Sequence, residues 1–460
     1  MLPVSLYTPV YHHAMLVVVI GFALLYLATQ APAAGLATFN QVAVIVIGFG
    51  VALFMGFRPI SGIYFVDMGA YASEYERVRQ GYEGRAADVL FNGLMRLCAP
   101  FLPATGFFFV CALIYIAPLA VASWRVHGVW AFPVFLAFLT AFSFWGYGTN
   151  GIRNGMAASV VILAFAFQDL PVIMLPLMAA AAAFHASTLL PAGAFLLVRY
   201  VKRTEIWLAF WVLCAAASSI GGNVGGMLVA HYNPFASDER LEKYIYGANE
   251  GGRFRADFLA YSIVPVVVAL LLAGRTRARA RRPGARVRGG RGLNWMWHRR
   301  ALRAIGVGSG KLACAQGGRW DWGVASARLG RAGREASSGL AGAWESPGGR
   351  ELSVPHAKAT PGASGRLPGV RLPEADAFYA RLVNTYLLAN AVWILVIHSD
   401  QSNRFAYLSW FMMPWVLLYP FVPGKIIDRP RTGLIATVLC AHYLFTYVMQ
   451  VVVYPLRGIQ

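Results

Sequence analysis

The sequence predicts an all-α, polytopic integral membrane protein with about 10–12 transmembrane helices, some of them broken or re-entrant. Of its 460 residues, 58% are hydrophobic, and the mean hydropathy is +0.54. These values are too apolar for an ordinary soluble domain. Many windows of about 20 mostly apolar residues, the length that spans a bilayer, follow one another with short polar loops between them.

The apolar segments are expected to form helices in the order in which they occur. They start near Tyr11, Gln41, Thr105, Val129, Arg153, Pro171, Ser187, Glu205, Ala256, Phe378, Arg404 and Thr432. The stretch from Pro171 to Val198 is too short for two full spans, because a helix rises only about 1.5 Å per residue. We therefore expect a broken or re-entrant pair with His185 in its turn. Because non-helical backbone at membrane depth needs protein or a water-filled cavity beside it, the break also predicts a cavity.

The segment from Arg275 to Pro373 differs from the rest of the chain. It holds half of the 40 Lys and Arg residues but only four of the 20 acidic residues, so the net charge of +20 belongs largely to it. It is rich in Gly, Ala and Arg without a sustained period, a composition that does not fold alone. We expect an N-terminal transmembrane bundle (1–274), a disordered cytoplasmic insertion or out-of-frame stretch (275–373), and C-terminal transmembrane helices (374–460).

Basic loops predict the orientation of the chain, because they remain on the cytoplasmic side. The loops "RYVKR" and "GKIIDRPR" and the Arg-rich segment should share that side. The polar residues of four other loops then face the opposite side, together with His185. These loops are Arg58 to Asp88, Gly148 to Asn154, His231 to Arg255, and His398 to Arg404.

The first polar group on that side lies between Phe57 and Val78. Asp67, Tyr71 and Tyr75 recur at every fourth position and so share one helical face. A carboxylate beside two aromatic rings suits sugar binding. The alternative is that Asp67 caps the helix and the tyrosines lie at the membrane interface.

Two arginines open apolar helices on the same side. Gly151, Gly155 and Ser159 form a ridge of small residues beside Arg153, and such a ridge allows close helix packing. Arg404 opens a second helix. A guanidinium matches phosphate oxygens, and a helix N-terminus adds positive partial charge. Both arginines therefore point to one diphosphate, whereas the alternative is pairing with lipid headgroups.

His185 and two loops complete the candidate residues. Ionisable groups in apolar segments are rare and tend to be functional, although a satisfied structural histidine is the alternative. The loop "DERLEKYIYG" offers Arg240, Tyr244 and Tyr246 as a lid, and Tyr407 follows Arg404. No set of His or acidic residues has metal-ligand spacing, and the five cysteines show no CxxC motif, so we expect no metal site.

Five motifs together resemble the EpsG-type, Wzy-like polysaccharide polymerases. They are "FRP…VDMGAY", "GIRNGMA", "AFHAST", "EKYIYG" and "NRFAYLSW". The resemblance covers roughly Met55 to Val422 without the insertion, and "IRNGMA" with "FHAST" is its most specific pair.

The resemblance implies a GT-C-like membrane glycosyltransferase. It would join polyprenyl-diphosphate-linked oligosaccharide repeats into O-antigen, capsule or exopolysaccharide, with its active site facing the periplasm from the bacterial cytoplasmic membrane. Arg153 and Arg404 would hold the departing diphosphate, and Asp67 or His185 would take the acceptor proton. The residues expected to bind substrate are Arg58, Tyr71, Tyr75, Arg240, Tyr244 and Tyr407.

Partners and rival functions follow from the same reasoning. No P-loop or dinucleotide motif occurs, so we expect a lipid-linked donor, no cofactor and no ATP-driven pump. Membrane lipid is an expected partner, a chain-length regulator and a flippase are candidate partners, and nucleic acid is not expected. The rivals are an O-antigen ligase, a membrane acyltransferase, and a transporter or flippase that binds lipid-linked sugar without catalysis.

Overall fold

The computed structural model describes residues 2–28, 34–82, 88–221, 224–225, 227, 254–280, 377–399, 402–423, 425–426 and 432–456. All of them belong to one compact unit formed by residues 1–283 and 368–460. Within this described part the secondary structure is helical and no strand occurs. The all-α class predicted from the sequence is therefore confirmed.

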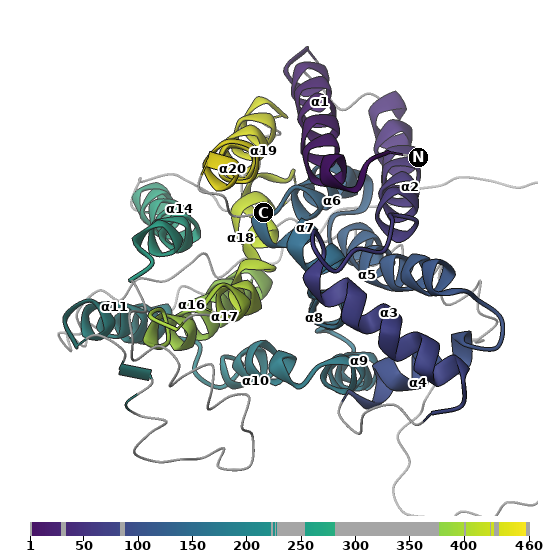
Figure 1. Ribbon diagram of the computed structural model, residues 1–460. Helices are drawn as coiled ribbons and strands as arrows, with labels where there is room; N and C mark the ends of the chain where they lie inside the picture. Colours follow the sequence, from purple (N-terminus) through teal and green to yellow (C-terminus); the bar gives the residue numbers. More distant parts are fainter. Residues whose placement is uncertain are drawn as a thin grey trace, which may run out of the picture. The chain divides into compact units, whose positions relative to one another are not determined.

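The helices follow the apolar segments of the sequence (Figure 1). In chain order they are α1 (Tyr7–Ala28), α2 (Ala34–Gly56), α3 (Val66–Arg79), α4 (Val89–Cys98), α5 (Ala104–His127), α6 (Ala131–Leu139), α7 (Phe142–Thr149), α8 (Ile152–Ala166), α9 (Pro171–Phe184), α10 (Leu189–Leu197), α11 (Thr204–Gly221), α14 (Ala256–Ala280), α16 (Ala377–Leu395), α17 (Ser402–Trp410), α18 (Met413–Leu418) and α19 (Thr432–Tyr447). The short 3-10 helix η3 (Ala186–Thr188) precedes α10, and the π-helical stretch η6 (Val448–Val453) continues α19 into the short α20 (Tyr454–Leu456).

Five helical stretches in the described part are long and apolar enough to cross a membrane. They are Val4–Ala28, Leu36–Gly56, Ala104–Leu139, Thr204–Gly221 and Thr432–Val453. Shorter apolar helices accompany them, including α4, α8, α9 and the first part of α14. Large apolar side chains such as Val17, Leu24 and Ile45 are exposed on α1 and α2, as expected of surfaces that face lipid. The chain is therefore a polytopic membrane protein.

The predicted break at His185 is confirmed. The helix α9 ends at Phe184, the backbone of His185 is extended (φ −162°, ψ 122°), and α10 begins only after η3. With 14 and 9 residues, α9 and α10 are about 21 and 14 Å long, too short to span a bilayer singly. One further break was not predicted: the segment after Val129 divides into α6 and α7. The separation of α7 from α8 agrees with the expected turn between the spans that start near Val129 and Arg153.

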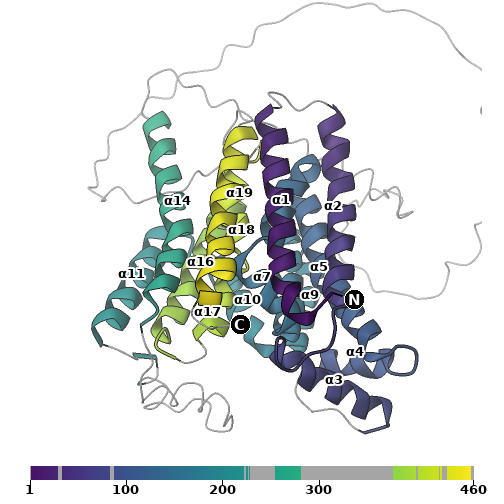
Figure 2. The ribbon, with the colours of Figure 1, turned by 45° about the horizontal axis from the view of Figure 1, so that its top comes forward.

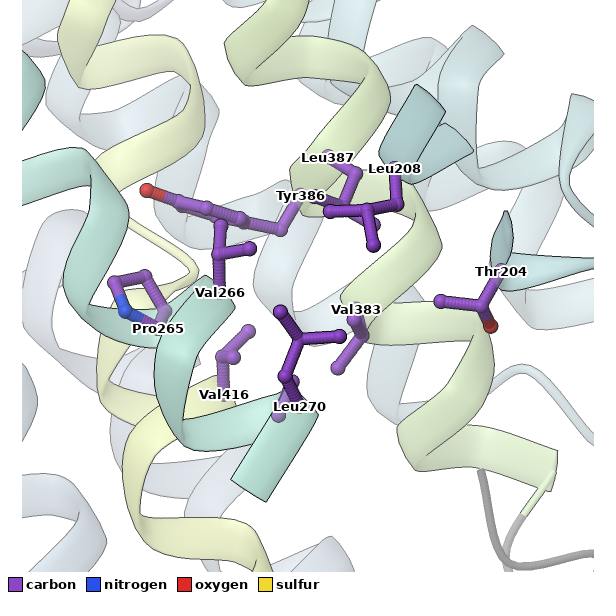
Figure 3. Close-up of a pocket in the computed structure, with 10 residues that line it drawn as sticks. Thr204, Leu208, Pro265, Val266, Leu270, Val383, Tyr386, Leu387 and Val416 are labelled. Carbon is purple, nitrogen blue, oxygen red and sulfur yellow. The ribbon is translucent and has the colours of Figure 1, made fainter. Parts of the chain in front are cut away.

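The helix α5 packs against α2 and α8, and α8 packs in turn against α9, while α10 and α11 pack against α16. The first and last long helices, α1 and α19, are neighbours (Figure 2). Between α1 and α2 lies an apolar crevice of about 370 Å³. A second apolar crevice, among α11, α14, α16 and α18 (Figure 3), holds only about 10 Å³ and is a packed helix interface rather than a substrate chamber.

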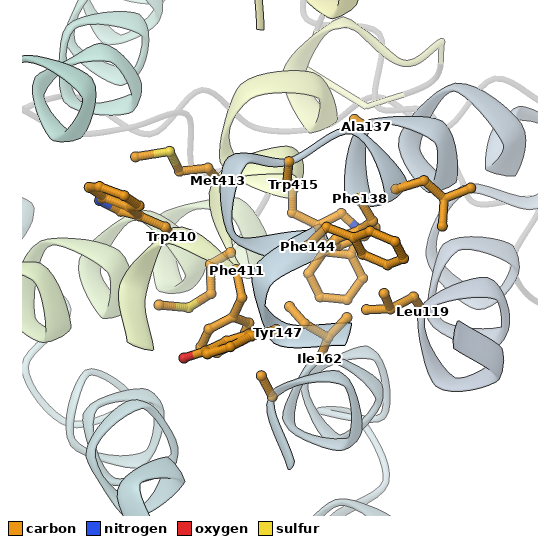
Figure 4. Close-up of a cluster of buried hydrophobic side chains, with 14 of the residues drawn as sticks. Leu119, Ala137, Phe138, Phe144, Tyr147, Ile162, Trp410, Phe411, Met413 and Trp415 are labelled. Carbon is orange, nitrogen blue, oxygen red and sulfur yellow. The ribbon is translucent and has the colours of Figure 1, made fainter. Parts of the chain in front are cut away.

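The core contains many aromatic side chains from α5 to α8 and from α17 and α18 (Figure 4). Beside it, a buried hydrogen-bond network joins four helices. The Asn390 side chain accepts a bond from Trp211 Nε1 (2.7 Å) and donates to Ser409 Oγ (2.9 Å) and Ser262 Oγ (3.2 Å). Trp410 Nε1 also donates to Ser262 Oγ (2.8 Å). This network fixes α17, the helix that carries Arg404, against α11, α14 and α16.

Candidate functional site

The helices α3 and α4 lie across the ends of the upright helices (Figure 2), where α3 contacts α5 and α4 contacts α9. The N-cap position of α3 is occupied by Phe65, so Asp67 lies in the first turn and does not cap the helix. Tyr71 follows one turn later on the same face, with its ring buried against Phe91. The shared face of Asp67 and Tyr71 is therefore confirmed, but Tyr71 is not an interfacial side chain.

Arg153 lies in the first turn of α8, which packs closely on α7. A Cβ on Gly155 would lie only 2.8 Å from the carbonyl oxygen of Tyr147, so only glycine permits this contact. One turn further, Ser159 Oγ donates to the Ile114 carbonyl of α5 (3.3 Å). The predicted ridge of small residues thus holds the start of α8, and Arg153 with it, in a fixed place.

The guanidinium of Arg153 is held on two sides. Its Nη1 forms an ion pair with Asp88, and its Nε donates to Tyr71 Oη (3.2 Å). The guanidinium carbon also lies 5.2 Å from the centre of the Tyr71 ring, within range of a cation–π interaction. The side chains of Arg153 and Asp88 are only 20% and 12% exposed.

Asp88 is the site residue that the sequence analysis missed. Its backbone is left-handed (φ 59°, ψ 56°), and it is the one non-glycine residue with positive φ in the described part of the chain. It occupies the N-cap position of α4, yet its carboxylate caps no N–H of that helix. An aspartate directly before the apolar run "VLFNGLMRLC" is a helix-start signal that could have identified α4. No local pattern could have identified its partner, Arg153.

A second ion pair joins α3 to α17. Arg404 Nη2 lies 3.4 Å from Asp67 Oδ2, and these side chains are 46% and 27% exposed. The pair is longer and more exposed than that of Arg153 with Asp88, so solvent screens it more. Further along α17, the ring of Tyr407 packs edge-on against Tyr147, with 5.1 Å between the ring centres.

These residues form one group, which we call the charged cluster: Asp67, Tyr71, Asp88, Arg153, His185 and Arg404. Tyr71 lies within electrostatic range of Asp67, Arg153 and Arg404, and burial raises the pKa of its hydroxyl, which is therefore protonated at neutral pH. His185 lies within range of Asp88, Arg153 and Arg404. Segments up to 337 residues apart in sequence thus meet at one end of the helices.

His185 is positioned by its own turn and lies outside the five candidate spans. Its Nδ1 accepts a bond from the Ser187 N–H (3.3 Å) and lies 2.7 Å from Ser187 Oγ. An Nδ1 that accepts an N–H carries no proton, so the neutral ring has its proton on Nε2. Burial lowers the pKa of His185, and burial together with the charges of Arg153 and Arg404 outweighs the opposing charge of Asp88, which raises it. At neutral pH the ring is an uncharged donor through Nε2.

Arg58 and Tyr75, both expected to bind substrate, are packing residues in the structure. Arg58 is 1% exposed and donates to the carbonyls of Met55 and Thr149, the latter at 2.8 Å. Burial lowers its pKa to about 9. Tyr75 is fully buried, and its hydroxyl donates to the Leu102 carbonyl (2.8 Å). Their contacts are with backbone carbonyls and aromatic rings rather than with the charged cluster.

The other candidates divide between described and undescribed residues. Tyr407 lies on the helix of Arg404 and packs on Tyr147, as given above. Arg240, Tyr244 and Tyr246 lie outside the described residues. Among the described residues no three His, Cys, Asp or Glu side chains are grouped so that they could hold a metal ion.

One family model matches the chain, that of the EpsG family, over residues 41–286. This range is more than half of the chain, and it contains Asp67, Tyr71, Asp88, Arg153 and His185. Arg404 and the motif "NRFAYLSW" lie beyond it, so the match ends earlier than the predicted resemblance. No curated protein and no solved structure matches the chain. The chain therefore belongs to the EpsG family, which indicates a membrane protein of polysaccharide biosynthesis with a polymerase-type function.

Proposed function

We propose that this protein is a membrane glycosyltransferase that polymerises polyprenyl-diphosphate-linked oligosaccharide repeats into O-antigen, capsule or exopolysaccharide. The charged cluster would face the periplasm, at the outer face of the bacterial cytoplasmic membrane. The observation that carries the proposal is that Arg153 and Arg404, far apart in sequence, lie against successive turns of α3 beside the break at His185. Two guanidinium groups at the ends of apolar helices suit a lipid whose headgroup is a diphosphate.

The chemistry is a displacement at the anomeric carbon of the growing chain. The acceptor hydroxyl forms the new C–O bond, its proton passes to a base, and the bond to the lipid diphosphate breaks. Negative charge then develops on the departing diphosphate, where Arg153 and Arg404 stabilise it. The Nδ1 atom of His185 is occupied by the Ser187 N–H. The geometry therefore favours an aspartate of the cluster as the base, with His185 donating through Nε2 to a sugar or phosphate oxygen.

Reconstituted protein supplied with a lipid-linked repeat unit tests the proposal. We expect longer glycan together with release of the lipid diphosphate, in amounts that match the bonds formed. Movement of intact lipid-linked sugar between leaflets, without chain growth, would instead identify a transporter. Transfer of a preformed glycan to a different lipid acceptor would identify a ligase.

Two replacements of His185 separate a donor from a base. His185→Gln retains an N–H donor near the position of Nε2 but is not basic, whereas His185→Ala retains neither property. If His185 is a donor, we expect the alanine variant to lose about 10²-fold in turnover and the glutamine variant clearly less. Equal losses in the two variants, measured as initial rates of diphosphate release, would assign the proton transfer to His185 after all.

Removal of residues 284–367 tests whether the Arg-rich insertion is accessory. These residues lie outside the compact unit that holds the charged cluster, and the family match ends at residue 286. With a short Gly/Ser linker in their place, we expect polymerisation within about threefold of the full chain, because the linker only has to close a loop. A deletion variant that is monodisperse in detergent but inactive would show that the segment takes part in the reaction.

A further inference from the structure

Both arginines of the charged cluster are already paired with carboxylates. The guanidinium of Arg153 is bound by Asp88, and that of Arg404 by Asp67. The carboxylates use Nη1 of Arg153 and Nη2 of Arg404, and a phosphoryl group that binds through these atoms competes with them directly. An anion bound at these donors therefore takes the place of the carboxylates.

We propose that Asp67 and Asp88 are exchangeable counter-ions, displaced when a diphosphate binds with one phosphoryl group on each arginine. The identity of the ligand rests on the proposed function, whereas the exchange rests on the two ion pairs. In the resting site the carboxylates neutralise two cations that would otherwise stand partly buried and uncompensated.

The spacing of the two pairs suits one diphosphate. Asp67 and Tyr71 are one helical turn apart on α3, so their Cβ atoms are about 5–6 Å apart. Asp67 holds Arg404, and the Tyr71 hydroxyl receives a bond from Arg153 Nε. The two guanidinium groups therefore contact successive turns of one helix, and the spacing of those turns is comparable with the span of two linked phosphoryl groups.

Asp88 has a second place for its carboxylate. It stands at the N-cap position of α4 without capping that helix, and its backbone is held in the left-handed region. When a phosphoryl group replaces it on Arg153, the carboxylate can bond to the N–H groups in the first turn of α4, where negative charge is favoured. The displaced charge is thus accommodated within the site rather than left unpaired.

The two pairs differ in strength. The Arg153–Asp88 pair is the more buried, and the Arg404–Asp67 pair is longer and more exposed. A competing carboxylate hinders an anion more strongly when its own pair is less screened by water. Removing the charge of Asp88 should therefore tighten anion binding more than removing the charge of Asp67.

Calorimetric titration of the full chain in nanodiscs tests the exchange, with inorganic pyrophosphate and orthophosphate as probes. The variants are Asp67→Asn, Asp88→Asn and the double variant. Asparagine tolerates the left-handed backbone and also caps helices, so position 88 keeps its conformation. Glu76→Gln is the matched control, because it removes the same charge from an exposed pair with Arg79 on the same helix.

We expect Asp88→Asn to tighten pyrophosphate binding about tenfold and Asp67→Asn about threefold. The two effects should multiply in the double variant, while Glu76→Gln changes little. Orthophosphate has a single phosphoryl group and can bind only one of the two arginines. The double variant should therefore bind orthophosphate no more tightly than the tighter-binding of the two single variants.

Pyrophosphate affinity that is unchanged or weaker in both single variants would overturn the exchange. Multiplying effects with orthophosphate would show that the arginines do not share one diphosphate. These outcomes are independent of the polymerisation assay. If the exchange is observed but no glycan grows, the proposed function fails while the anion site stands.

Discussion

Replacing Arg153 by alanine is expected to lower polymerisation by about 10³-fold while the protein still inserts and folds, because a fixed charge at the leaving group is lost. Arg153→Lys should recover only part of the activity. A lysine keeps the positive charge, but it lacks the forked guanidinium group. That group pairs with Asp88 through Nη1 and donates to Tyr71 through Nε at the same time. The measurement is the rate of diphosphate release in a reconstituted assay with a lipid-linked repeat unit.

The matched control is Arg79→Ala, which removes an arginine from an exposed pair with Glu76 on α3. This control should leave the rate unchanged. Arg404→Ala should act in the same direction as Arg153→Ala, since it also removes a cation from the charged cluster. Unimpaired polymerisation in both Arg153→Ala and Arg404→Ala would refute the assignment of a diphosphate to the cluster.

Replacing Arg58 by alanine is expected to damage folding rather than catalysis. Its guanidinium bonds to carbonyls near the C-terminal ends of α2 and α7, where the helix dipole favours a cation. Hydrogen bonds from a charged group contribute about 1.5–3 kcal/mol each, so the variant should lose about 3 kcal/mol or more of stability. The buried guanidinium also lies near the rings of Phe65 and Phe108, and this packing would be lost as well.

The thermal unfolding midpoint in detergent and the activity per folded molecule separate the two roles of Arg58. We expect a lower midpoint with normal activity in the molecules that remain folded. An Arg58→Ala variant with an unchanged unfolding midpoint and no activity would show that Arg58 binds substrate. Arg79→Ala again serves as the control, because its surface pair contributes little to stability.

The positions of the helices could be predicted because lipid demands long apolar segments, and these are visible in the sequence. The break at His185 was also visible, since a polar turn and a proline interrupt a stretch too short for two spans. The division between α6 and α7 was not visible, because both halves are apolar and no charged residue marks Thr140. Helix α4 has only ten residues, too few to cross a bilayer, so the length of its apolar run does not distinguish it.

The pairs within the charged cluster could not be predicted, because each joins segments that only the fold brings together. Residue type and place in the sequence single out the two arginines and Asp67 as candidates. They do not single out Asp88, because its contact is with Arg153, 65 residues later. Arg58 shows a different limit of sequence reasoning. Its partners in the structure are backbone carbonyls, which leave no signature in the side-chain pattern, so the sequence does not reveal that it joins two helices.

The contact between α1 and α19 has a consequence for biosynthesis. Tyr443 donates its hydroxyl proton to the carbonyl of His12 (2.5 Å), across 431 residues of chain. A ribosome adds about 5–20 residues per second. The helix α19 is therefore synthesised roughly 20–90 s after α1. Throughout that interval the insertion machinery or surrounding lipid must shelter the inner face of α1, including the buried His12. Truncation before α19 therefore leaves α1 without one of the helices against which it packs.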